Sequence, residues 1–190
     1  TDTITLSADA ATIVDADFTN IDNVEGFTTA DGANSVTLGT KAVDSGLATV
    51  TGGDDDDTID ASAFAGALTV ASGAGDDVIN GGKSGSMVIY GGSGLDIITG
   101  GESSEKFKYR STTEMGTSLE FAESITSFSD ENDMIWLSWS GINFEDDINI
   151  SDDGIDTTIL INQDNEKDGY LKLIGISDSS IITFADFQFG

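Results

Sequence analysis

Residues 52–109 carry a short repeat, and this repeat limits the possible folds more than any other feature of the chain. The six units read GGDDDDTID, ASAFAGALTVA, SGAGDDVIN, GGKSGSMVIY, GGSGLDIIT and GGESSEKFKY. The third and fifth units fit the nonapeptide pattern G-G-x-G-x-D-x-U-x almost completely, where U is a large apolar residue. The first unit keeps the two glycines, the Asp and the apolar residue. Such a repeat predicts an all-β fold, a parallel β-roll or β-solenoid.

Each unit has a glycine-rich turn and a very short strand with one apolar side chain. Paired glycines such as Gly91 and Gly92 allow positive φ angles and a close approach of neighbouring turns, so carbonyl oxygens can point to a shared centre. Calcium needs about 6–8 oxygen ligands, which carbonyls and Asp carboxylates from two stacked turns can supply. The repeat therefore predicts calcium-binding turns. The expected inward-facing residues are Ile59, Leu68, Ile79, Val88, Ile98 and Phe107.

The spacing of the aspartates predicts which turns share an ion. If one coil contains two units, successive turns alternate between two edges of the roll. Asp57, Asp77 and Asp96 are 20 and 19 residues apart, so they should lie above one another on one edge. This arrangement predicts two calcium sites, one between each successive pair of turns. The expected ligand residues are Gly52, Gly53, Asp55, Asp57, Ser72, Gly73, Gly75, Asp77, Gly91, Gly92, Gly94 and Asp96.

The opposite edge has a different composition. Its turns should stack near Gly66, Ser86 and Glu105, where the repeat's Asp is replaced. We therefore expect weak or absent calcium binding on that edge.

The net charge links the repeat to folding. Seven basic residues against 35 acidic residues give a net charge of −28, which opposes compaction in the absence of counterions. A divalent cation that binds only the folded state would tip this balance. The sequence therefore predicts that calcium promotes folding.

The flanking regions predict three segments. Residues 1–50 are expected to form calcium-poor solenoid coils, with a core of Ile21, Val24, Val36, Leu38, Leu47 and Val50; residues 51–109 form the roll. Residues 110–190 contain longer strands, including alternating patterns at 157–161 and 170–173 that indicate half-buried antiparallel pairing. Because a solenoid end exposes unpaired strand edges, we expect this C-terminal antiparallel region to cap the stack.

From residue 72 onward the chain resembles the C-terminal region of RTX (repeats-in-toxin) exoproteins, especially the β-roll module of serralysin-type secreted proteins. After the last glycine-rich turn, that family has the stretch I-x-x-F-x-x-x-x-D-x-I-x-L-S and a terminal A-D-F. The matching residues here are Ile125, Phe128, Asp133, Ile135, Leu137 and Ser138, then Ala185, Asp186 and Phe187. Residues 1–60 resemble, more loosely, the coils of large RTX surface proteins such as S-layer proteins and adhesins.

The resemblance implies secretion by a type I apparatus that recognises an uncleaved signal near the C-terminus. The chain would stay unfolded at low cytosolic calcium and fold at millimolar calcium outside the cell. It would act as an extracellular calcium-binding structural or secretion module of a large RTX surface protein of the S-layer or adhesin type, secreted or held at the cell surface. The alternative is a non-catalytic C-terminal module of a secreted protease, lipase or polysaccharide epimerase.

Composition excludes several other functions. The chain has no His and no Cys, so Ser–His–Asp, Cys–His and H-E-x-x-H sites cannot form, and we expect no enzymatic activity. Its acidity disfavours nucleic acid as a partner, and it has no apolar run long enough for direct membrane insertion. The remaining candidate partners are the type I apparatus, cell-surface polysaccharide and other copies of the chain.

Two local features leave alternatives open. Asp164-x-Glu166-x-Asp168-Gly169 resembles the start of a calcium loop, but a polar hairpin tip is the favoured interpretation because the usual Glu is missing at Gly175. Trp136 and Trp139 could form a platform for a sugar or a partner, although core packing is favoured for both.

Overall fold

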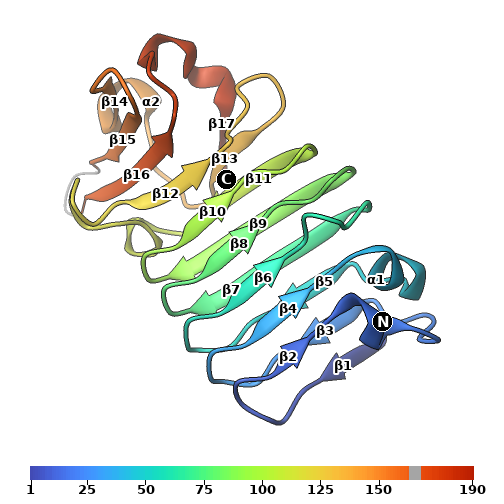
Figure 1. The fold of residues 1–190 in the computed structure, drawn as a ribbon. Coiled ribbons are helices and arrows are strands. Elements are labelled where there is room, and N and C mark those ends of the chain that lie inside the picture. Colours follow the sequence, from blue (N-terminus) through green and yellow to red (C-terminus); the bar gives the residue numbers. More distant parts are fainter. Residues whose placement is uncertain (163–167) are drawn as a thin grey trace.

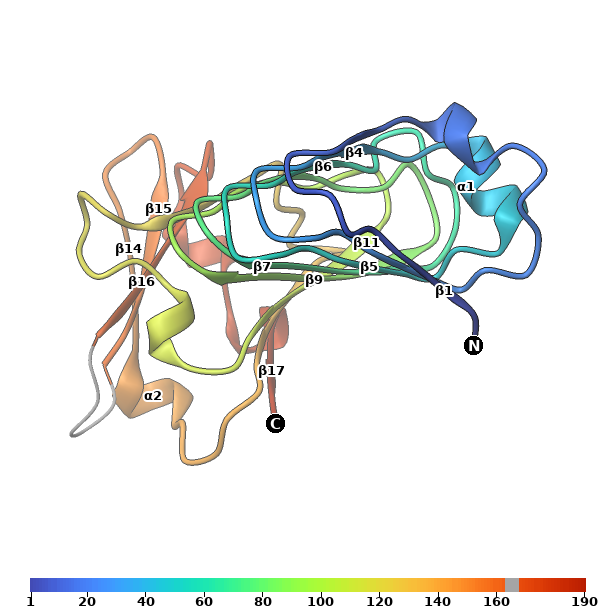
Figure 2. The ribbon, with the colours of Figure 1, turned by 90° about the horizontal axis from the view of Figure 1, so that it is seen from below.

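The computed structural model describes residues 1–162 and 168–190, and these residues form a β-roll of two facing sheets. The chain passes from one sheet to the other and back in each coil, so the strands climb the stack in sequence order (Figure 1). Seen from below, the coils appear as flattened loops (Figure 2). Within the described residues, no helix is long and apolar enough to cross a membrane. The predicted all-β parallel roll is confirmed.

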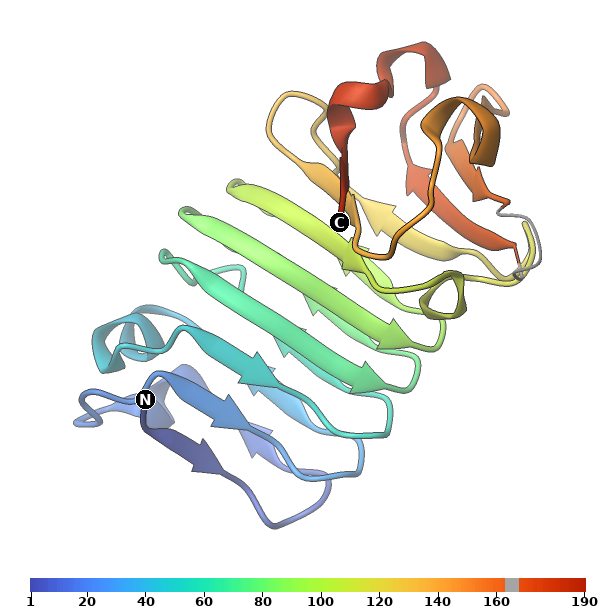
Figure 3. The same ribbon diagram turned by 180° about the vertical axis from the view of Figure 1, so that it is seen from behind.

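The first sheet contains eight parallel strands, whose long members are seen from behind in Figure 3. In spatial order they are β1 (Thr3–Thr5), β3 (Gly26–Thr28), β5 (Thr49–Thr51), β7 (Leu68–Ala74), β9 (Ser86–Ser93), β11 (Ser104–Tyr109), β13 (Met134–Leu137) and β17 (Phe187–Phe189).

The second sheet contains six parallel strands in sequence order and three further strands at its C-terminal end. They are β2 (Thr12–Ile13), β4 (Ser35–Thr37), β6 (Thr58–Asp60), β8 (Val78–Asn80), β10 (Ile97–Thr99) and β12 (Glu123–Thr126), then β16 (Gly169–Ile174), β15 (Thr157–Ile161) and β14 (Ile148–Asp152). The short helices are α1 (Thr40–Ser45), α2 (Phe144–Asp147), η1 (Asp15–Phe18), η2 (Thr112–Glu114), η3 (Ser179–Ile181) and η4 (Phe184–Asp186).

The core consists of two ladders of apolar side chains, one from each sheet. Because each strand pairs in register with the next, one inward position repeats up the whole stack. The first ladder runs through Phe27, Val50, Val70, Ile89, Phe107, Ile135 and Phe187. The second runs through Val36, Ile59, Ile79, Ile98, Ile125 and Leu173.

Three core predictions need correction. Val88 is half-buried and points outward, while Met87 and Ile89 are buried, because Leu68 pairs with Met87 in the long strand β9. Ile21 and Val24 are also only half-buried. Phe18 and Phe27 fill the N-terminal core instead, with ring centroids 5.6 Å apart in an edge-on contact.

The C-terminal region is antiparallel only in part. β14, β15 and β16 pair antiparallel, as the alternating sequence patterns predict. β12, β13, β16 and β17, however, add to the two sheets in parallel, so the ladder continues beyond Tyr109.

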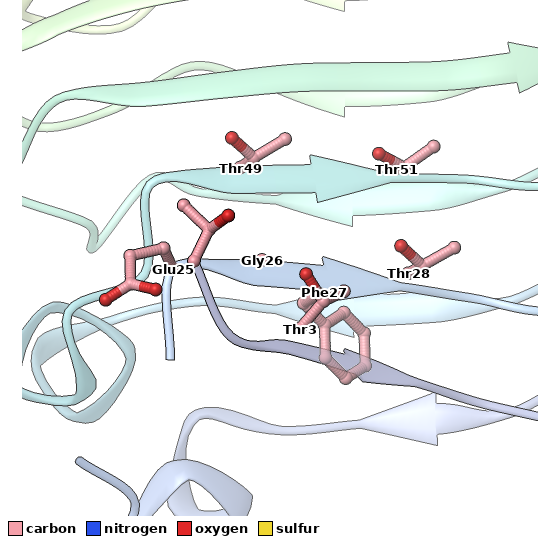
Figure 4. Close-up of a pocket in the computed structure, with 8 residues that line it drawn as sticks. Thr3, Glu25, Gly26, Phe27, Thr28, Thr49 and Thr51 are labelled. Atoms are coloured by element: carbon pink, nitrogen blue, oxygen red, sulfur yellow. The ribbon is translucent and has the colours of Figure 1, made fainter. Parts of the chain in front are cut away.

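The outer face of the first sheet changes along the stack. Near the N-terminal end it presents threonines, with Thr49 and Thr51 on β5 beside Thr28 on β3, around a shallow pocket (Figure 4). Towards the C-terminal end the same outward rows present Tyr90, Lys106, Lys108 and Trp136.

Candidate metal centre

Three aspartates lie in a column on one edge of the roll, which we call the aspartate edge (turns 29–34, 52–57, 72–77 and 91–96). Each of Asp57, Asp77 and Asp96 directly precedes a strand of the second sheet, and these strands pair in register. The backbone N–H of Asp57 donates to Asp77 Oδ1 at 2.7 Å, and that of Asp77 donates to Asp96 Oδ1 at 2.9 Å. The 20- and 19-residue spacings therefore produce the predicted stack.

The second carboxylate oxygens of two of these residues are buried without a hydrogen-bond partner. Asp77 and Asp96 are 0% and 1% exposed, and neither Oδ2 has a partner among the described residues. Asp57 differs, because its Oδ2 accepts a hydrogen bond from the Gly53 N–H at 3.1 Å. Burial raises the pKa of Asp77 to about 7 and that of Asp96 to about 6, since desolvation disfavours the charged form. Within residues 1–162 and 168–190, these two oxygens therefore have neither a hydrogen-bond donor nor a positively charged partner.

The glycines bring the backbones of adjacent turns into contact. Gly92 and Gly94 have φ angles of 109° and 138°, and a Cβ on either would overlap the carbonyl oxygen of Gly73 or Gly75 in the turn below. Gly52 lies against the Ser72 carbonyl oxygen in the same way. Only glycine permits both this conformation and this approach. Turn carbonyls are thus stacked beside the carboxylate column.

All twelve predicted ligand residues lie in the three stacked turns 52–57, 72–77 and 91–96, but their side chains play different parts. Asp55 is exposed, and its Oδ2 accepts a hydrogen bond from the Gly32 N–H at 3.0 Å, whereas its backbone lies against Gly75. The Ser72 hydroxyl donates to the Gly91 carbonyl at 2.7 Å. Carboxylates from Asp57, Asp77 and Asp96 point inward.

The donor set fits a hard cation held mainly by backbone oxygens. Within residues 1–162 and 168–190, no group of three or more acidic side chains is arranged to hold a metal by itself. Carbonyl oxygens must therefore supply most ligands. The two partnerless carboxylate oxygens beside stacked turn carbonyls meet the oxygen-only preference of calcium.

The turn below the column is completed without a cation. Asn34 occupies the register position below Asp57, and its amide nitrogen donates to Ala30 O at 2.8 Å, to Gly32 O, and to Asp57 Oδ1 at 3.1 Å. The Asn34 N–H also donates to Asp57 Oδ1 at 2.7 Å. Sequence reasoning missed this residue, although D-G-A-N lies one coil before the first aspartate turn.

The opposite edge contains one buried carboxylate pair. Glu105 is fully buried and pairs in register with Met87 rather than with Ser86, which is exposed, so the expected stack of Ser86 and Glu105 is wrong by one residue. The Glu105 N–H donates to Asp133 Oδ1 at 2.9 Å, and the Ser103 hydroxyl donates to Glu105 Oε1. Burial raises the pKa of Glu105 to about 7. Weak binding on this edge stays a prediction.

Two further predicted features have different outcomes. In the proposed loop at 164–168, Asp164 and Glu166 lie outside the described residues. Trp139 packs against the core, as favoured, but Trp136 lies on the outer face of β13, where the Lys108 ammonium sits 3.5 Å from its ring centroid. Its indole N–H is buried without a hydrogen-bond partner in the described structure.

Comparison with known proteins addresses the repeat and the fold separately. The RTX calcium-binding nonapeptide repeat family matches residues 49–66, 69–84 and 88–104. No curated protein matches the chain significantly.

Among solved structures, two subunits of the mannuronan C5-epimerase of Azotobacter vinelandii share the fold. They are 22% and 21% identical, each with a TM-score of 0.56. The first comparison covers 71% of this chain and 78% of the subunit, and the second covers 74% and 92%. Taken with the stacked glycine turns, these matches show that the chain carries calcium-binding RTX nonapeptide repeats folded as a β-roll.

Proposed function

We propose that this chain is a secreted, non-catalytic structural module that folds on calcium after type I export and serves a large RTX surface protein of the S-layer or adhesin type. Support comes from the RTX repeats, the net charge of −28 and the calcium-free coils that precede the repeats. Such coils extend the solenoid at its N-terminal side and suit a structural role.

The two partnerless oxygens of Asp77 and Asp96 carry this proposal. A buried, ionised carboxylate without a partner is costly, whereas a bound cation makes it favourable. When bound, calcium would supply positive charge to this column. Asp77 and Asp96 would orient one oxygen each towards the ion, while their Oδ1 atoms fix the N–H of the coil below. Because the turns are held together only in the folded chain, binding energy becomes folding energy.

The decisive experiment is a calcium titration followed by far-UV circular dichroism. Wild-type protein should gain β signal cooperatively with calcium and not with magnesium, whose geometry and hydration are more demanding. Asp77→Asn should raise the calcium midpoint at least about tenfold, because the turn loses a carboxylate but keeps its size. Asp54→Asn, an exposed change of the same charge in the adjacent turn, should leave the midpoint nearly unchanged. A chain fully folded in chelator and indifferent to calcium would contradict the proposal.

A second candidate function is supported by the basic and aromatic residues on the outer face of the first sheet. Lys108 lies between Tyr90 and Trp136, with its ammonium 5.2 Å and 3.5 Å from their ring centroids. The Arg110 guanidinium lies 4.6 Å from the Tyr90 ring centroid, and the ammonium of Lys106, in the neighbouring outward row, lies 5.7 Å from the Trp136 ring centroid. These cations stand together in a chain with seven basic residues. This arrangement favours an accessory module of a secreted enzyme that contacts an acidic polysaccharide.

Binding assays separate the two candidates. An accessory module should bind a polyuronate such as mannuronan and not a neutral glucan, with affinity that decreases as salt increases. The double variant Lys106→Ala and Lys108→Ala should weaken this binding, whereas Lys83→Ala, an exposed change on the opposite edge, should not. Equal binding of the polyuronate by all variants, or no binding by the wild type, would favour the structural module alone.

A further inference from the structure

The carboxylate column continues beyond the glycine-rich turns. Glu123, the first residue of β12, occupies the register position next to Asp96, because Ile97 pairs with Ser124 and the Ser124 N–H donates to the Asp96 carbonyl at 3.1 Å. The chain reaches Glu123 through residues 110–122, which replace the short glycine turn of the earlier coils. The column thus extends into the C-terminal region.

Glu123, like Asp77 and Asp96, has one buried carboxylate oxygen without a hydrogen-bond partner among the described residues. The residue is 0% exposed, and its Oε1 accepts a hydrogen bond from the Tyr109 hydroxyl at 3.1 Å. Its Oε2 is buried without a partner in the described residues, as is the Oδ2 of Asp96 in the adjacent coil. Two neighbouring coils therefore each present one unsatisfied carboxylate oxygen inside the same edge.

The surroundings add negative charge to this position. Burial raises the pKa of Glu123 well above its ordinary value, and the carboxylates of Asp96, Glu114 and Asp77 act in the same direction. On the far side, Glu123 pairs with Leu171 of β16, so the next position of the column is apolar and fully buried. The column therefore ends at Glu123, at the junction between the repeats and the C-terminal strands.

We propose that Asp96 and Glu123 hold a third calcium ion, which fastens the C-terminal region to the roll. The inference rests on the proposed function, since it assumes that the same column binds calcium between its glycine turns. Glu123 would supply Oε2 while the Tyr109 hydroxyl holds Oε1, and Asp96 would contribute to the ions on both of its sides.

The test compares calcium stoichiometry and tryptophan fluorescence. Both tryptophans, Trp136 and Trp139, lie on or just after β13, so their emission reports the C-terminal region, whereas circular dichroism reports mainly the roll. Glu123→Gln should bind one calcium ion fewer than the wild type in equilibrium dialysis. Its tryptophan transition should need at least about tenfold more calcium, while the dichroism midpoint stays within about twofold. Glu120→Gln, an exposed change of equal charge, should match the wild type in all three.

The outcomes separate this inference from the function on which it rests. If the wild type binds no calcium, both the proposed function and the third calcium site are overturned. A wild type that binds calcium, with the same ion count and the same tryptophan midpoint in Glu123→Gln, removes only the third site. If Glu123→Gln does not fold, Glu123→Asp decides: it should keep the ion count with a raised tryptophan midpoint, and an unchanged midpoint would overturn the third site.

Discussion

Two kinds of turn on the aspartate edge differ in how their buried oxygens are satisfied. At residues 29–34, the Asn34 amide donates to two turn carbonyls and to Asp57, so a neutral side chain supplies the positive hydrogens that the turn oxygens need. At 72–77 and 91–96, Asp77 and Asp96 supply only further negative oxygens. The difference teaches that an amide at this position satisfies the turn oxygens within the protein, whereas the carboxylates of Asp77 and Asp96 each leave one buried oxygen without a partner in the described residues.

Removing calcium should have the largest effect and should separate the two kinds of turn. In chelator at neutral pH, amides of residues 72–96 should lose hydrogen-exchange protection by at least about a hundredfold, because the ion and the folded turns form together. Amides near Asn34 should lose much less. Exchange followed by mass spectrometry, with and without calcium, measures both regions in one sample. Equal loss of protection in the two regions would contradict the comparison.

Replacing Asn34 by Asp should convert the first kind of turn into the second. Asn34→Asp removes the donor to Ala30 O and places a carboxylate beside that of Asp57. At a calcium concentration just sufficient to fold the wild type, we expect a loss of about 1–3 kcal/mol in the free energy of unfolding, which is the usual cost of a buried unsatisfied group. Urea unfolding gives the value, and Asn149→Asp on an exposed strand position is the control. Saturating calcium should restore most of the stability, so a loss unaffected by calcium would count against this interpretation.

A change of pH should have the smallest effect on stability, and the effect should have opposite signs in the calcium-free and the calcium-bound protein. The folded-state pKa values of Asp77 and Asp96, about 7 and about 6, lie above the ordinary value of 3.8, so the calcium-free fold binds protons more tightly than the unfolded chain. Its stability should therefore decrease as pH rises from about 4 to about 7. With saturating calcium the ion replaces the protons, and stability should increase over that range. Urea midpoints at pH 5 and pH 7.5 measure both slopes, and parallel slopes would be inconsistent with protons and calcium sharing these oxygens.

The repeating part of the molecule was predictable because the spacing of its repeats determines which residues pair between neighbouring coils. Asp57, Asp77 and Asp96 stack because 19–20 residues make one coil, which the sequence displays directly. Glu123 and Asp133 follow irregular segments, so only the folded structure shows which buried carboxylates they join. Val88 was misplaced because the long strand β9 shifts the inward positions by one residue. Asn34 was missed because a polar residue after Asp-Gly is also typical of any exposed turn.

One series of hydrogen bonds along the aspartate edge, from a backbone N–H to the Oδ1 atom of the next coil, runs in a single direction. In each bond, the backbone N–H belongs to the earlier coil and the side-chain oxygen belongs to the later coil, from Ala11 and Asn34 at one end to Asp77 and Asp96 at the other. The backbone hydrogen bonds between the same residues run the opposite way, because the Val78 N–H donates to the Asp57 carbonyl at 2.9 Å and the Ile97 N–H donates to the Asp77 carbonyl at 2.8 Å. Each contact between aspartate coils therefore contains one hydrogen bond in each direction, so a coil lost from either end of the column removes a donor and an acceptor together.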